Sequence, residues 1–532
     1  LGLSTLMPIS LAASIALITR LALVLSEVLF LALSYLAHRF IPHLKDAGFI
    51  KIKHKIENHT LILWTFILSY IAYFTYYSFE KHANFFTGRF DLGNMDQTVW
   101  NTLNGRIFQL TNPDGINPIS RLAIHSDFIL ILLAPAYLIW EDPRTLLFIQ
   151  TVILGAGAYF VYLIANHLLK NTTLATVLGI SFLLNPFVQK QNLFDFHPVV
   201  LSTTFLLAAF YFTQIKNYKF FLLFLMLAIL TKENVYLTAS IFGLYLTVKT
   251  KNKKWLFLTF GGFALFYILI AKLIPWARGG QHFATEYFQE FGDSPPEILL
   301  NLALNPLKII SGLLTQSNFS YLYKLFLPVG FLSIFSPLVL SFASPDFVIN
   351  LLSENENLRN LTFHYAATII PFVYIAAIFG LKQILSIKHK FFTPKLASYF
   401  IIIFSIYSTY QHGVLPGTKS PSLSIYDSYF PQRYEIKNFI ENIPQDLSVA
   451  STNNLGAHLS HREKIYTIPF GIEEADVVAF LLNDAYARPS LSEQREFARI
   501  LQNSPDYIEL YRTGDFIAFA KRSIAGKVLP PY

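Results

Sequence analysis

The sequence contains no cysteine among its 532 residues. This absence excludes a disulfide framework, a thiolate metal site and a cysteine nucleophile. Charged residues are also scarce, at 14% of the chain against about 25% in an ordinary soluble domain. Hydrophobic residues make up 53% and aromatic residues 16%, which suits lipid-facing helices and interfacial aromatic belts. The composition therefore predicts an integral membrane protein, whose first partner is the lipid bilayer.

The net charge of +8 is unevenly distributed along the chain. After residue 410 there are 12 Lys and Arg against 14 Asp and Glu, so the basic excess lies in the apolar part before that point. Such a distribution is typical of membrane topology and gives no indication of nucleic-acid binding. We expect no nucleic-acid partner.

Apolar runs recur through the first 410 residues, and about 20 such residues cross ~30 Å of hydrocarbon. The stretch Leu6–Ile41 could form one long helix or two, and residues 319–353 are interrupted by Pro328, Pro337 and Pro345, which suits a crossing plus a re-entrant piece. The pattern predicts a polytopic α-helical membrane protein with roughly 10–13 transmembrane helices. The clearest candidates are 61–79, 145–169, 173–188, 197–214, 219–232, 233–249, 255–274, 364–382 and 391–410.

Four connectors between these runs are rich in lysine, and the positive-inside rule places them in the cytoplasm. The remaining connections, and the C-terminal region, then lie outside the cell membrane, provided that 126–141 lies on or dips into the outer surface. The basic connectors carry Lys45, Lys51, Lys53 and Lys55; Lys216 and Lys219; Lys249, Lys251, Lys253 and Lys254; and Lys382, Lys388 and Lys390. The outer connections are 80–144, 188–197, 231–234, 275–320 and 354–364.

The C-terminal region alternates strand-like and helix-like segments, which is typical of a small α/β domain. It contains no Gly-rich phosphate loop and no paired-His zinc motif. The expected strands are Ser448–Thr452, Ile465–Ile468 and Asp476–Leu482, with helices through His458 and over Leu491–Gln502, and a hairpin of Tyr507–Tyr511 and Phe516–Ala520 around Thr513-Gly514. We divide the chain into a membrane anchor with a basic connector (1–60), a transmembrane domain (61–410) with outer loops 80–144 and 275–320, and a soluble extracytoplasmic α/β domain (411–532).

Residues that could take part in catalysis or ligand binding gather in the predicted outer connections, at helix ends. Membrane proteins often have their functional sites at such places. Asp91 and Asp96 lie in the first outer loop, directly after a helix. Two carboxylates five residues apart could bind a cation, or one could act as a general base toward an acceptor hydroxyl. Asp91 could equally cap the helix that follows.

Two further clusters carry histidine beside a charged residue. Arg121 and His125 precede an apolar run and could hold a phosphate oxygen and a sugar hydroxyl, although snorkelling toward headgroups is an equal alternative. Asp195 and His197 alternate in a tight connection and could share a metal. An ordinary Asp–His hydrogen bond in a turn explains that pair as well.

The most specific signal is the pair Lys232 and Glu233, because two opposite charges sit in a minimal turn between apolar runs. Lys232 could bind the phosphate of a lipid-linked donor while Glu233 orients it or joins a carboxylate network, and a plain interfacial ion pair is the alternative. The last cluster comprises Arg278, His282, Glu286 and Asp293 in the long outer loop, with His364 and Tyr365 at the start of a later helix. A loop of this length usually has a function.

These clusters also carry a family resemblance. From about residue 60 onward the chain resembles the domain-of-unknown-function family 2079 of predicted membrane proteins. That family is similar to the GT-C superfamily of membrane glycosyltransferases, which transfer sugars from polyprenyl-phosphate donors outside the cytoplasm. The resemblance is carried, in order, by FDLGNMDQTVWN, IHSDFILILLAPAY, FDFHP, LTKEN, HFATEYFQEFG, FHYAATIIPF and STNNLGAHLSHREKIYTIPF.

The resemblance implies roles for several residues. Asp91 occupies the place of the acidic residue that acts as base or metal ligand in the first outer loop, with Asp96 as its neighbour. Lys232 resembles the basic residue near the lipid phosphate. The His125 segment resembles a His-then-Pro stretch of lipid-A- and protein-mannosyl-type members, but Ser126 and Asp127 depart from that form.

The leading hypothesis is therefore a GT-C-like glycosyltransferase. Asp91, with Asp96, would perform catalysis on a glycan, lipid or protein acceptor. Lys232, Arg278 and Arg121 would hold the donor phosphate. The other candidates for the cavity are His125, Asp195, His197, Glu233, His282, His364 and Tyr365. Whether a divalent cation is a cofactor stays open. Its candidate ligands are Asp91, Asp96, Asp195, His197 and Glu233. The alternatives are a flippase or transporter of a lipid-linked intermediate and a non-catalytic envelope scaffold.

Overall fold

The computed structural model describes residues 58–387, 392–419, 421, 423, 426 and 429–528. The expected anchor at 1–60, including the run Leu6–Ile41, falls almost entirely outside these residues. The lysines of its basic connector lie outside them too, as do Lys388 and Lys390.

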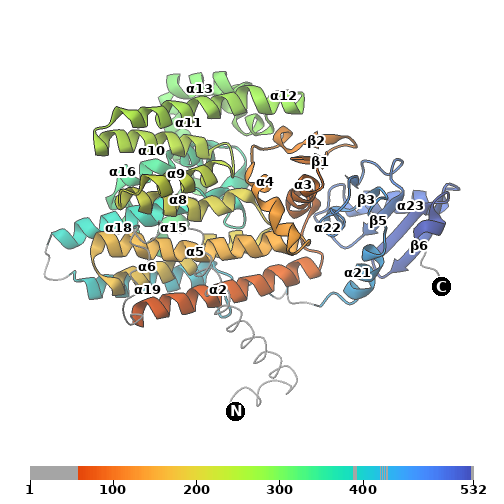
Figure 1. The fold of residues 1–532 in the computed structure, drawn as a ribbon, viewed down its shortest axis with the longest axis horizontal. Coiled ribbons are helices and arrows are strands. Elements are labelled where there is room, and N and C mark those ends of the chain that lie inside the picture. The colour runs from red at the N-terminus through yellow and green to blue at the C-terminus, as the bar shows by residue number, and fades with distance from the viewer. Residues whose placement is uncertain are drawn as a thin grey trace, which may run out of the picture.

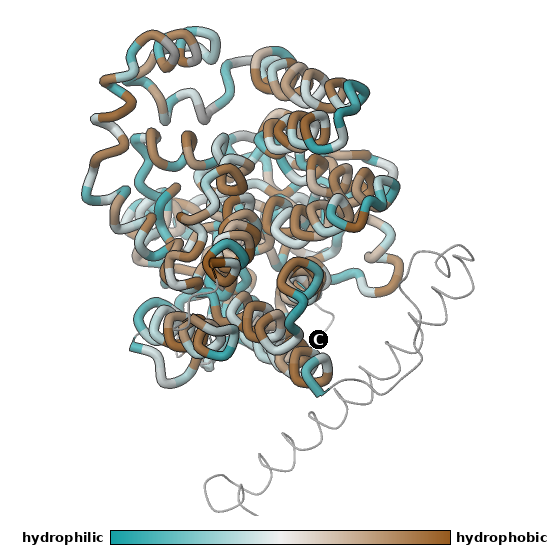
Figure 2. Tube along the Cα trace, turned by 90° about the vertical axis from the view of Figure 1, so that its left-hand side faces the viewer, coloured by the Kyte–Doolittle hydropathy of each residue, from teal (hydrophilic) through white to brown (hydrophobic). Residues whose placement is uncertain are grey.

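Long apolar segments between residues 58 and 412 form a packed set of helices, drawn red to cyan in Figure 1. Figure 2 shows many of them end-on, with hydrophobic residues on most turns. The main helices are α2 (Asn58–Ala83), α5 (Arg144–Leu169), α6 (Thr172–Leu183), α7 (Pro186–Leu193), α8 (Pro198–Gln214), α9 (Tyr218–Ile229), α10 (Val235–Thr250), α11 (Leu256–Ile268), α18 (Ile370–Ser386) and α19 (Pro394–His412).

Among the described residues, three helices are long and apolar enough to cross a membrane: Asn58–Ala83, Arg144–Leu169 and the continuous segment Lys253–Arg278. α6 and α7, bent by 42° at Leu184 and Asn185, count as a fourth span if they are taken together. Fewer described helices meet this criterion than the roughly 10–13 crossings expected from apolar runs of about 20 residues.

The short length of α8 has a physical explanation. Its 17 residues extend about 26 Å at 1.5 Å per residue, somewhat less than the hydrocarbon thickness. Almost every side chain of α8 is buried, and the helix packs against α5, α9 and α18. A helix surrounded by other helices contacts little lipid, so its length is set by packing against protein.

The two ends of the helical part differ in character. At one end Lys249 Nζ donates to Gln214 Oε1 at 3.0 Å, which holds two basic connectors together. At the other end the connections predicted to lie outside approach one another. The basic connectors and the predicted outer connections therefore lie at different ends of the helical part. Which of these ends faces the cell exterior stays a prediction.

The connections at this second end are built from short elements. The segment 319–353 is broken as its prolines indicate: Pro337 begins α16, and Pro345 lies in the first turn of α17. The elements of the first loop are a π-helical turn (Arg89–Gly93), α3 (Asn94–Leu103), β1 (Gln109–Thr111), β2 (Pro118–Ser120), a 3₁₀ turn (Arg121–Ala123), α4 (Ile129–Leu133) and a 3₁₀ turn (Ala134–Leu138). Those from residue 253 to 366 are 3₁₀ or π-helical turns at Lys253–Trp255, Leu269–Leu273, Phe283–Phe291, Leu327–Val329, Leu332–Phe335, Ser341–Ala343, Glu356–Arg359 and His364–Ala366, and helices α12 (Ile274–Arg278), α13 (Pro295–Leu304), α14 (Pro306–Leu313), α15 (Gln316–Phe326), α16 (Pro337–Leu340) and α17 (Ser344–Leu352).

The C-terminal region forms a small α/β domain, drawn blue in Figure 1. Its five-stranded sheet has the order β4-β3-β5-β7-β6; β3 pairs in parallel with β4 and β5, and β7 pairs antiparallel with β5 and β6. The strands expected from the sequence are present within a few residues, whereas the helix expected through His458 ends at Gly456. The elements are α21 (Arg433–Glu441), β3 (Val449–Ser451), α22 (Asn453–Gly456), β4 (Ile465–Thr467), β5 (Val477–Leu481), α23 (Leu491–Asn503), β6 (Tyr507–Thr513), β7 (Phe516–Lys521) and α24 (Ala525–Val528).

The sheet buries an apolar layer on each face. On one face Ile436 of α21 belongs to the core; on the other, Leu501 of α23 does. Phe85, which follows α2, is 3% exposed and joins the α21 face of this core. A side chain from the membrane part thus completes the core of the C-terminal domain.

Polar contacts fix the same junction. Asn84 Nδ2 donates to the carbonyl oxygen of Tyr426 at 2.7 Å, and Gln97 Nε2 donates to that of Arg462 at 3.0 Å. A Cβ on Gly456 would lie 2.2 Å from Cβ of Arg89, so only glycine allows this close approach. The domain is therefore docked on the first loop.

Candidate functional site

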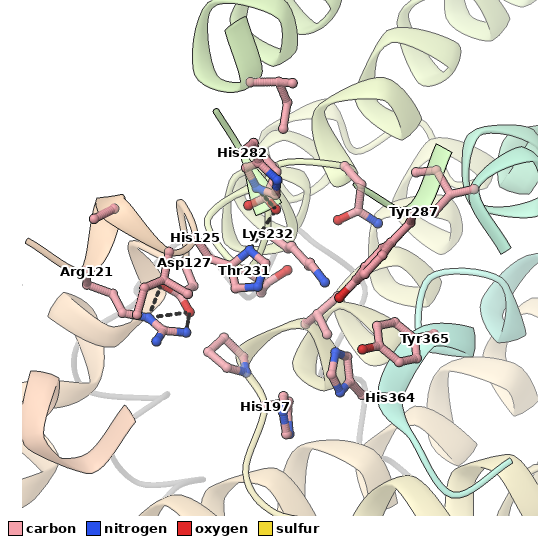
Figure 3. A pocket seen from close by; sticks show the side chains of 18 of the residues that line it. Arg121, His125, Asp127, His197, Thr231, Lys232, His282, Tyr287, His364 and Tyr365 are labelled. Carbon is pink, nitrogen blue, oxygen red and sulfur yellow. Dashed lines mark hydrogen bonds and ion pairs between the residues drawn. The ribbon is translucent and has the colours of Figure 1, made fainter. Parts of the chain in front are cut away.

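A cavity of about 760 Å³ opens where the predicted outer connections meet. Segments far apart in the sequence line it, and Figure 3 shows their side chains converging on it. It brings together ten residues that the sequence singles out: Asp91, Arg121, His125, His197, Lys232, Glu233, Arg278, His282, His364 and Tyr365. The sequence predicts these residues at one cavity, and the structure places all ten on its wall.

Asp91 is held at the cavity by the π-helical turn Arg89–Gly93. Beneath this turn the buried guanidinium of Arg89 donates to Gln97 Oε1 at 2.7 Å and to the carbonyl oxygen of Thr111 at 3.2 Å. The side chain of Asp91 lines the cavity and is 36% exposed. It makes no side-chain capping bond to α3, whose N-cap is Gly93, so the helix-cap alternative does not describe this residue.

The carboxylate of Asp91 instead faces His197, with Oδ1 3.2 Å from Nε2. The other ring nitrogen, Nδ1, lies 3.1 Å from the carbonyl oxygen of Asp195. A carbonyl oxygen only accepts, so Nδ1 carries a proton, and Nε2 is the ring nitrogen that faces the carboxylate of Asp91. Asp91 and His197 form a close carboxylate–imidazole pair.

The contact with His197 lowers the pKa of Asp91. Burial by itself would raise the pKa of Asp91, but the hydrogen bond and positive charge of His197 outweigh it and hold the pKa below its usual value. Asp91 is therefore an ionised carboxylate at neutral pH. The imidazole of His364 stacks on that of His197, with ring centroids 3.9 Å apart, and fixes its orientation.

Lys232 projects into the middle of the cavity from the turn between α9 and α10 (Figure 3). Its amine lies 5.6 Å from the ring centroid of Tyr365, a cation–π distance. Among the described residues no carboxylate forms an ion pair with this amine. The adjacent Glu233 turns to His125 and not to Lys232, so the interfacial ion pair between sequence neighbours is not formed, and the amine faces the cavity.

Glu233 joins two histidines on one side of the cavity. Its Oε1 lies 2.8 Å from His125 Nδ1 and 3.6 Å from His282 Nε2. The burial of Glu233 favours a raised pKa, but the two histidines and the neighbouring Lys232 hold this pKa well below its usual value. Glu233 is thus a buried carboxylate between two imidazoles.

The two arginines at the cavity differ in exposure. Arg121 is buried, and its guanidinium binds Asp127 with an Nη2–Oδ2 distance of 2.7 Å and Nε at 3.1 Å from both carboxylate oxygens. This bidentate pair neutralises most of its charge locally. Arg278 is exposed at the end of α12 and lies on the cavity wall. It is the better placed of the two to meet an anionic ligand.

Asp195 does not line the cavity. Its Oδ1 accepts from Lys81 Nζ at 2.6 Å, and its Oδ2 accepts from the backbone N–H of Gly88 at 2.8 Å. Both side chains of the ion pair are almost fully buried. Asp195 therefore fixes the end of α2 to the connection that carries His197. It is close to the Asp91–His197 pair in the sequence and structure, but its role is in this connection and not in the cavity.

Asp96 does not line the cavity either. The carboxylate is completely buried and faces the C-terminal domain, where it lies 3.0 Å from His461 Nε2 and accepts from the hydroxyls of Ser460 and Tyr137. The five-residue spacing to Asp91 places the two carboxylates on different sides of the loop. Asp96 thus connects the first loop to the C-terminal domain.

The pairing of Asp96 with His461 predicts a pH dependence. Burial would lower the pKa of His461, but the charge and hydrogen bond of Asp96 outweigh it and raise this pKa. A raised folded-state pKa gives stability that is fully present below the unfolded value near about 6.5 and is lost as pH rises through the folded value. We expect hydrogen–deuterium exchange at residues 458–463, corrected for intrinsic rates, to be faster at pH 9 than at pH 6. His461→Gln should abolish this difference; an equal pH effect in the variant would contradict the assignment.

Some cavity residues were not anticipated from the sequence. Tyr287, Asp346 and Asn350 also line the wall. Asp346 is buried and accepts a hydrogen bond from Asn234, while its Oδ2 has no hydrogen-bond partner among the described residues. The sequence signal that could have identified Asp346 is a carboxylate within an apolar stretch that is broken by prolines. Glu286 and Asp293, in contrast, are exposed and lie off the cavity wall.

An apolar wall completes the cavity. Phe266 and Ile270 contribute to it from the helical segment Lys253–Arg278. The opposite face of this helix carries Phe257 and Phe260, which are 85% and 69% exposed. The segment therefore stands between the cavity and the lipid-facing surface.

Comparisons with known proteins place these observations in context. The family described as "Predicted membrane protein (DUF2079)" matches residues 81–511, which include both the helical part and most of the C-terminal domain. No curated protein matches the chain.

Two similar solved structures are ArnT from Cupriavidus metallidurans bound to undecaprenyl phosphate and the same protein in the apo state. Each has a TM-score of 0.48 and 10% sequence identity. The matches cover 88% and 83% of this chain, and 99% and 94% of those chains.

Proposed function

The chain belongs to the DUF2079 family of predicted membrane proteins, and on that premise we propose that it is a membrane glycosyltransferase. It transfers a sugar from a polyprenyl-phosphate-linked donor to an acceptor hydroxyl on the extracytoplasmic side. The observation that carries the proposal is the convergence of the Asp91–His197 pair and the Lys232 amine in one cavity. Sugar transfer from a phosphate donor needs a base for the acceptor and a cation for the leaving group.

The carboxylate of Asp91 is the base of this reaction. It is ionised, partly exposed to the cavity and held in place by His197. An acceptor hydroxyl transfers its proton to Asp91 as the acceptor oxygen forms a bond to the anomeric carbon. The bond from that carbon to the donor phosphate oxygen breaks, and the electron pair leaves with the polyprenyl phosphate.

The leaving phosphate requires positive charge, which Lys232 and Arg278 on the cavity wall provide. Lys232 is not engaged by a described carboxylate, so its charge remains available to a ligand. The apolar residues Phe266 and Ile270 give the lipid chain a hydrophobic surface next to the bilayer. Arg121 contributes less, because Asp127 already binds its guanidinium.

Replacing Lys232 by methionine tests the donor site. Hydrogen bonds to charged groups contribute about 1.5–3 kcal/mol, so we expect the variant to bind a polyprenyl phosphate about 10- to 150-fold more weakly. The measurement is the dissociation constant of a fluorescent polyprenyl phosphate for the purified full chain in detergent.

The exposed Lys254, which lies in a basic connector away from the cavity, provides the matched control. Lys254→Met removes the same charge and should leave the dissociation constant unchanged. Equal binding by the wild type and Lys232→Met would remove Lys232 from the donor site. Equal weakening by both variants would show a nonspecific charge effect and would also contradict its role.

The proline-broken segment favours a second candidate, a flippase of a lipid-linked intermediate. This segment supplies Asp346, Ile349 and Asn350 to the cavity wall, and broken helices are typical of transporters. A flippase would move the labelled lipid across a liposome bilayer, with Asp91→Asn having little effect on transport. Sugar transfer that depends on Asp91 would exclude this candidate, and a non-catalytic scaffold as well.

A further inference from the structure

Three side chains from separate connections converge at one edge of the cavity. His125 comes from the first outer loop, Glu233 from the turn between α9 and α10, and His282 from the segment after α12. One ligand atom of each residue lies within 4.8 Å of the other two. Glu233 and His282 are buried, and the side chain of His125 is 20% exposed. Figure 3 shows His282 above His125, with Lys232 beside His125.

The distances suit a shared metal ion. Imidazole nitrogens and carboxylate oxygens bind Zn²⁺ at about 2.0–2.2 Å in tetrahedral geometry, which places neighbouring donors roughly 3.3 Å apart. The distances from Glu233 Oε1, 2.8 Å to His125 Nδ1 and 3.6 Å to His282 Nε2, bracket this value. Both imidazole nitrogens therefore face the same carboxylate oxygen, as two ligands of one ion would.

The surrounding contacts direct the ligand atoms. The backbone N–H of Ser126 donates to Glu233 Oε2 at 3.2 Å, which leaves Oε1 for the two histidines. The backbone N–H of Ile129 donates to the carbonyl oxygen of Leu230 at 2.8 Å and joins the two connections that carry His125 and Glu233. Support of this kind around ligating side chains is typical of metal sites in proteins.

We propose that His125, Glu233 and His282 form a binding site for a divalent transition metal, with Zn²⁺ favoured by two imidazoles and one carboxylate. The three protein ligands leave one coordination position, which opens into the cavity. The site fixes the segment after α12 to the first outer loop. These ligands differ from most of those expected from the sequence, because His125 and His282 join Glu233 while Asp91 and His197 form their own pair.

The metal site is a property of these three side chains and is measured without sugar transfer. If the proposed function holds, and only in that case, the open position can accept a phosphate oxygen of the donor. Failure of metal binding would leave the roles of Asp91 and Lys232 untouched. Failure of sugar transfer would leave the metal site standing.

The test uses the purified full chain in detergent, stripped with a chelator and then titrated with Zn²⁺ in competition with a chromophoric chelator. We expect one tight equivalent, confirmed by elemental analysis after gel filtration. Changing a residue that only supports a ligand costs about 10–100-fold in metal affinity, so removal of a ligand in His282→Ala or Glu233→Gln should cost at least about 100-fold. Co²⁺ should give the visible absorption of a four-coordinate site in the wild type and lose it in these variants.

His197→Ala provides the matched control, since it removes another histidine of the same cavity. It should keep the Zn²⁺ equivalent and the Co²⁺ spectrum. Loss of the metal in His197→Ala but not in His282→Ala would assign it to the Asp91–His197 pair and overturn the proposal. No tight equivalent in the wild type, or equal binding by the wild type and His282→Ala, would overturn it as well. Gel filtration and thermal unfolding of each variant establish that it is folded.

Discussion

Replacing Asp91 by asparagine is expected to lower the rate of sugar transfer by about 10²- to 10⁴-fold, the contribution typical of a general base. Asparagine keeps the size and shape of the side chain but cannot accept the proton of an acceptor hydroxyl. The measurement is single-turnover transfer from a polyprenyl-phosphate-linked sugar by the purified chain, with expression, gel filtration and donor binding compared in parallel. A rate equal to that of the wild type would exclude Asp91 as the base.

Asp114 offers a matched control. It is exposed and lines the same cavity, whereas the carboxylate that pairs with His197 is that of Asp91. Asp114→Asn makes the same chemical change and should leave the rate nearly unaltered. A similar loss in both variants would indicate a general effect of cavity charge.

The pH profile gives a second readout of the same role. Because the pKa of Asp91 lies below its usual value, the wild-type rate should stay level through neutral pH and fall only when pH drops through this lowered pKa. His197→Gln removes the positive charge that opposes burial, so the acid limb should move to higher pH. An unmoved acid limb would show that another group controls the profile.

The buried ion pair of Lys81 and Asp195 predicts a large effect on stability. Lys81→Met leaves a buried carboxylate without its cation, which typically costs about 3–5 kcal/mol. The backbone N–H of Gly88 still donates to Asp195 but does not balance its charge. Reversible unfolding of the purified chain in mixed micelles, followed by circular dichroism, measures the free energy of unfolding.

A double variant separates the loss of charge balance from the loss of packing. Lys81→Met combined with Asp195→Asn removes both charges and should recover much of the stability lost in Lys81→Met alone. Equal destabilisation of the single and double variants would show that packing, and not the unpaired carboxylate, determines the effect.

The fold was predictable where local patterns determine structure. The apolar runs at 61–79 and 145–169 lie in α2 and α5, and the hairpin expected around Thr513-Gly514 is formed by β6 and β7. These elements were predictable because hydrophobic periodicity and turn residues depend only on neighbouring residues. Helix length was less predictable. α8 is short because it is surrounded by protein, and a run of apolar residues is the same whether it faces lipid or other helices.

The site was predictable as a set of residues, but not as a set of pairs. Polar residues at helix ends indicated the cavity wall, because a charged group beside a bilayer is costly unless it is paired or functional. Their partners lie far away in the chain: Asp96 meets His461, and Asp195 meets Lys81. Asp96 follows Asp91 by only five residues, yet Asp91 lines the cavity and Asp96 faces the C-terminal domain. Only the packing of distant segments assigns one carboxylate to the cavity and the other to the domain junction.

The position of Phe85 has a consequence for how the protein is made. This residue directly follows α2, yet it lies in the core of the domain formed by residues 433–528, which are synthesised much later. Until those residues have been made and have folded against the first loop, the ring of Phe85 and the carboxylate of Asp96 lack the partners that bury them. A chain truncated before β7 would therefore lack a completed junction between the first loop and this domain.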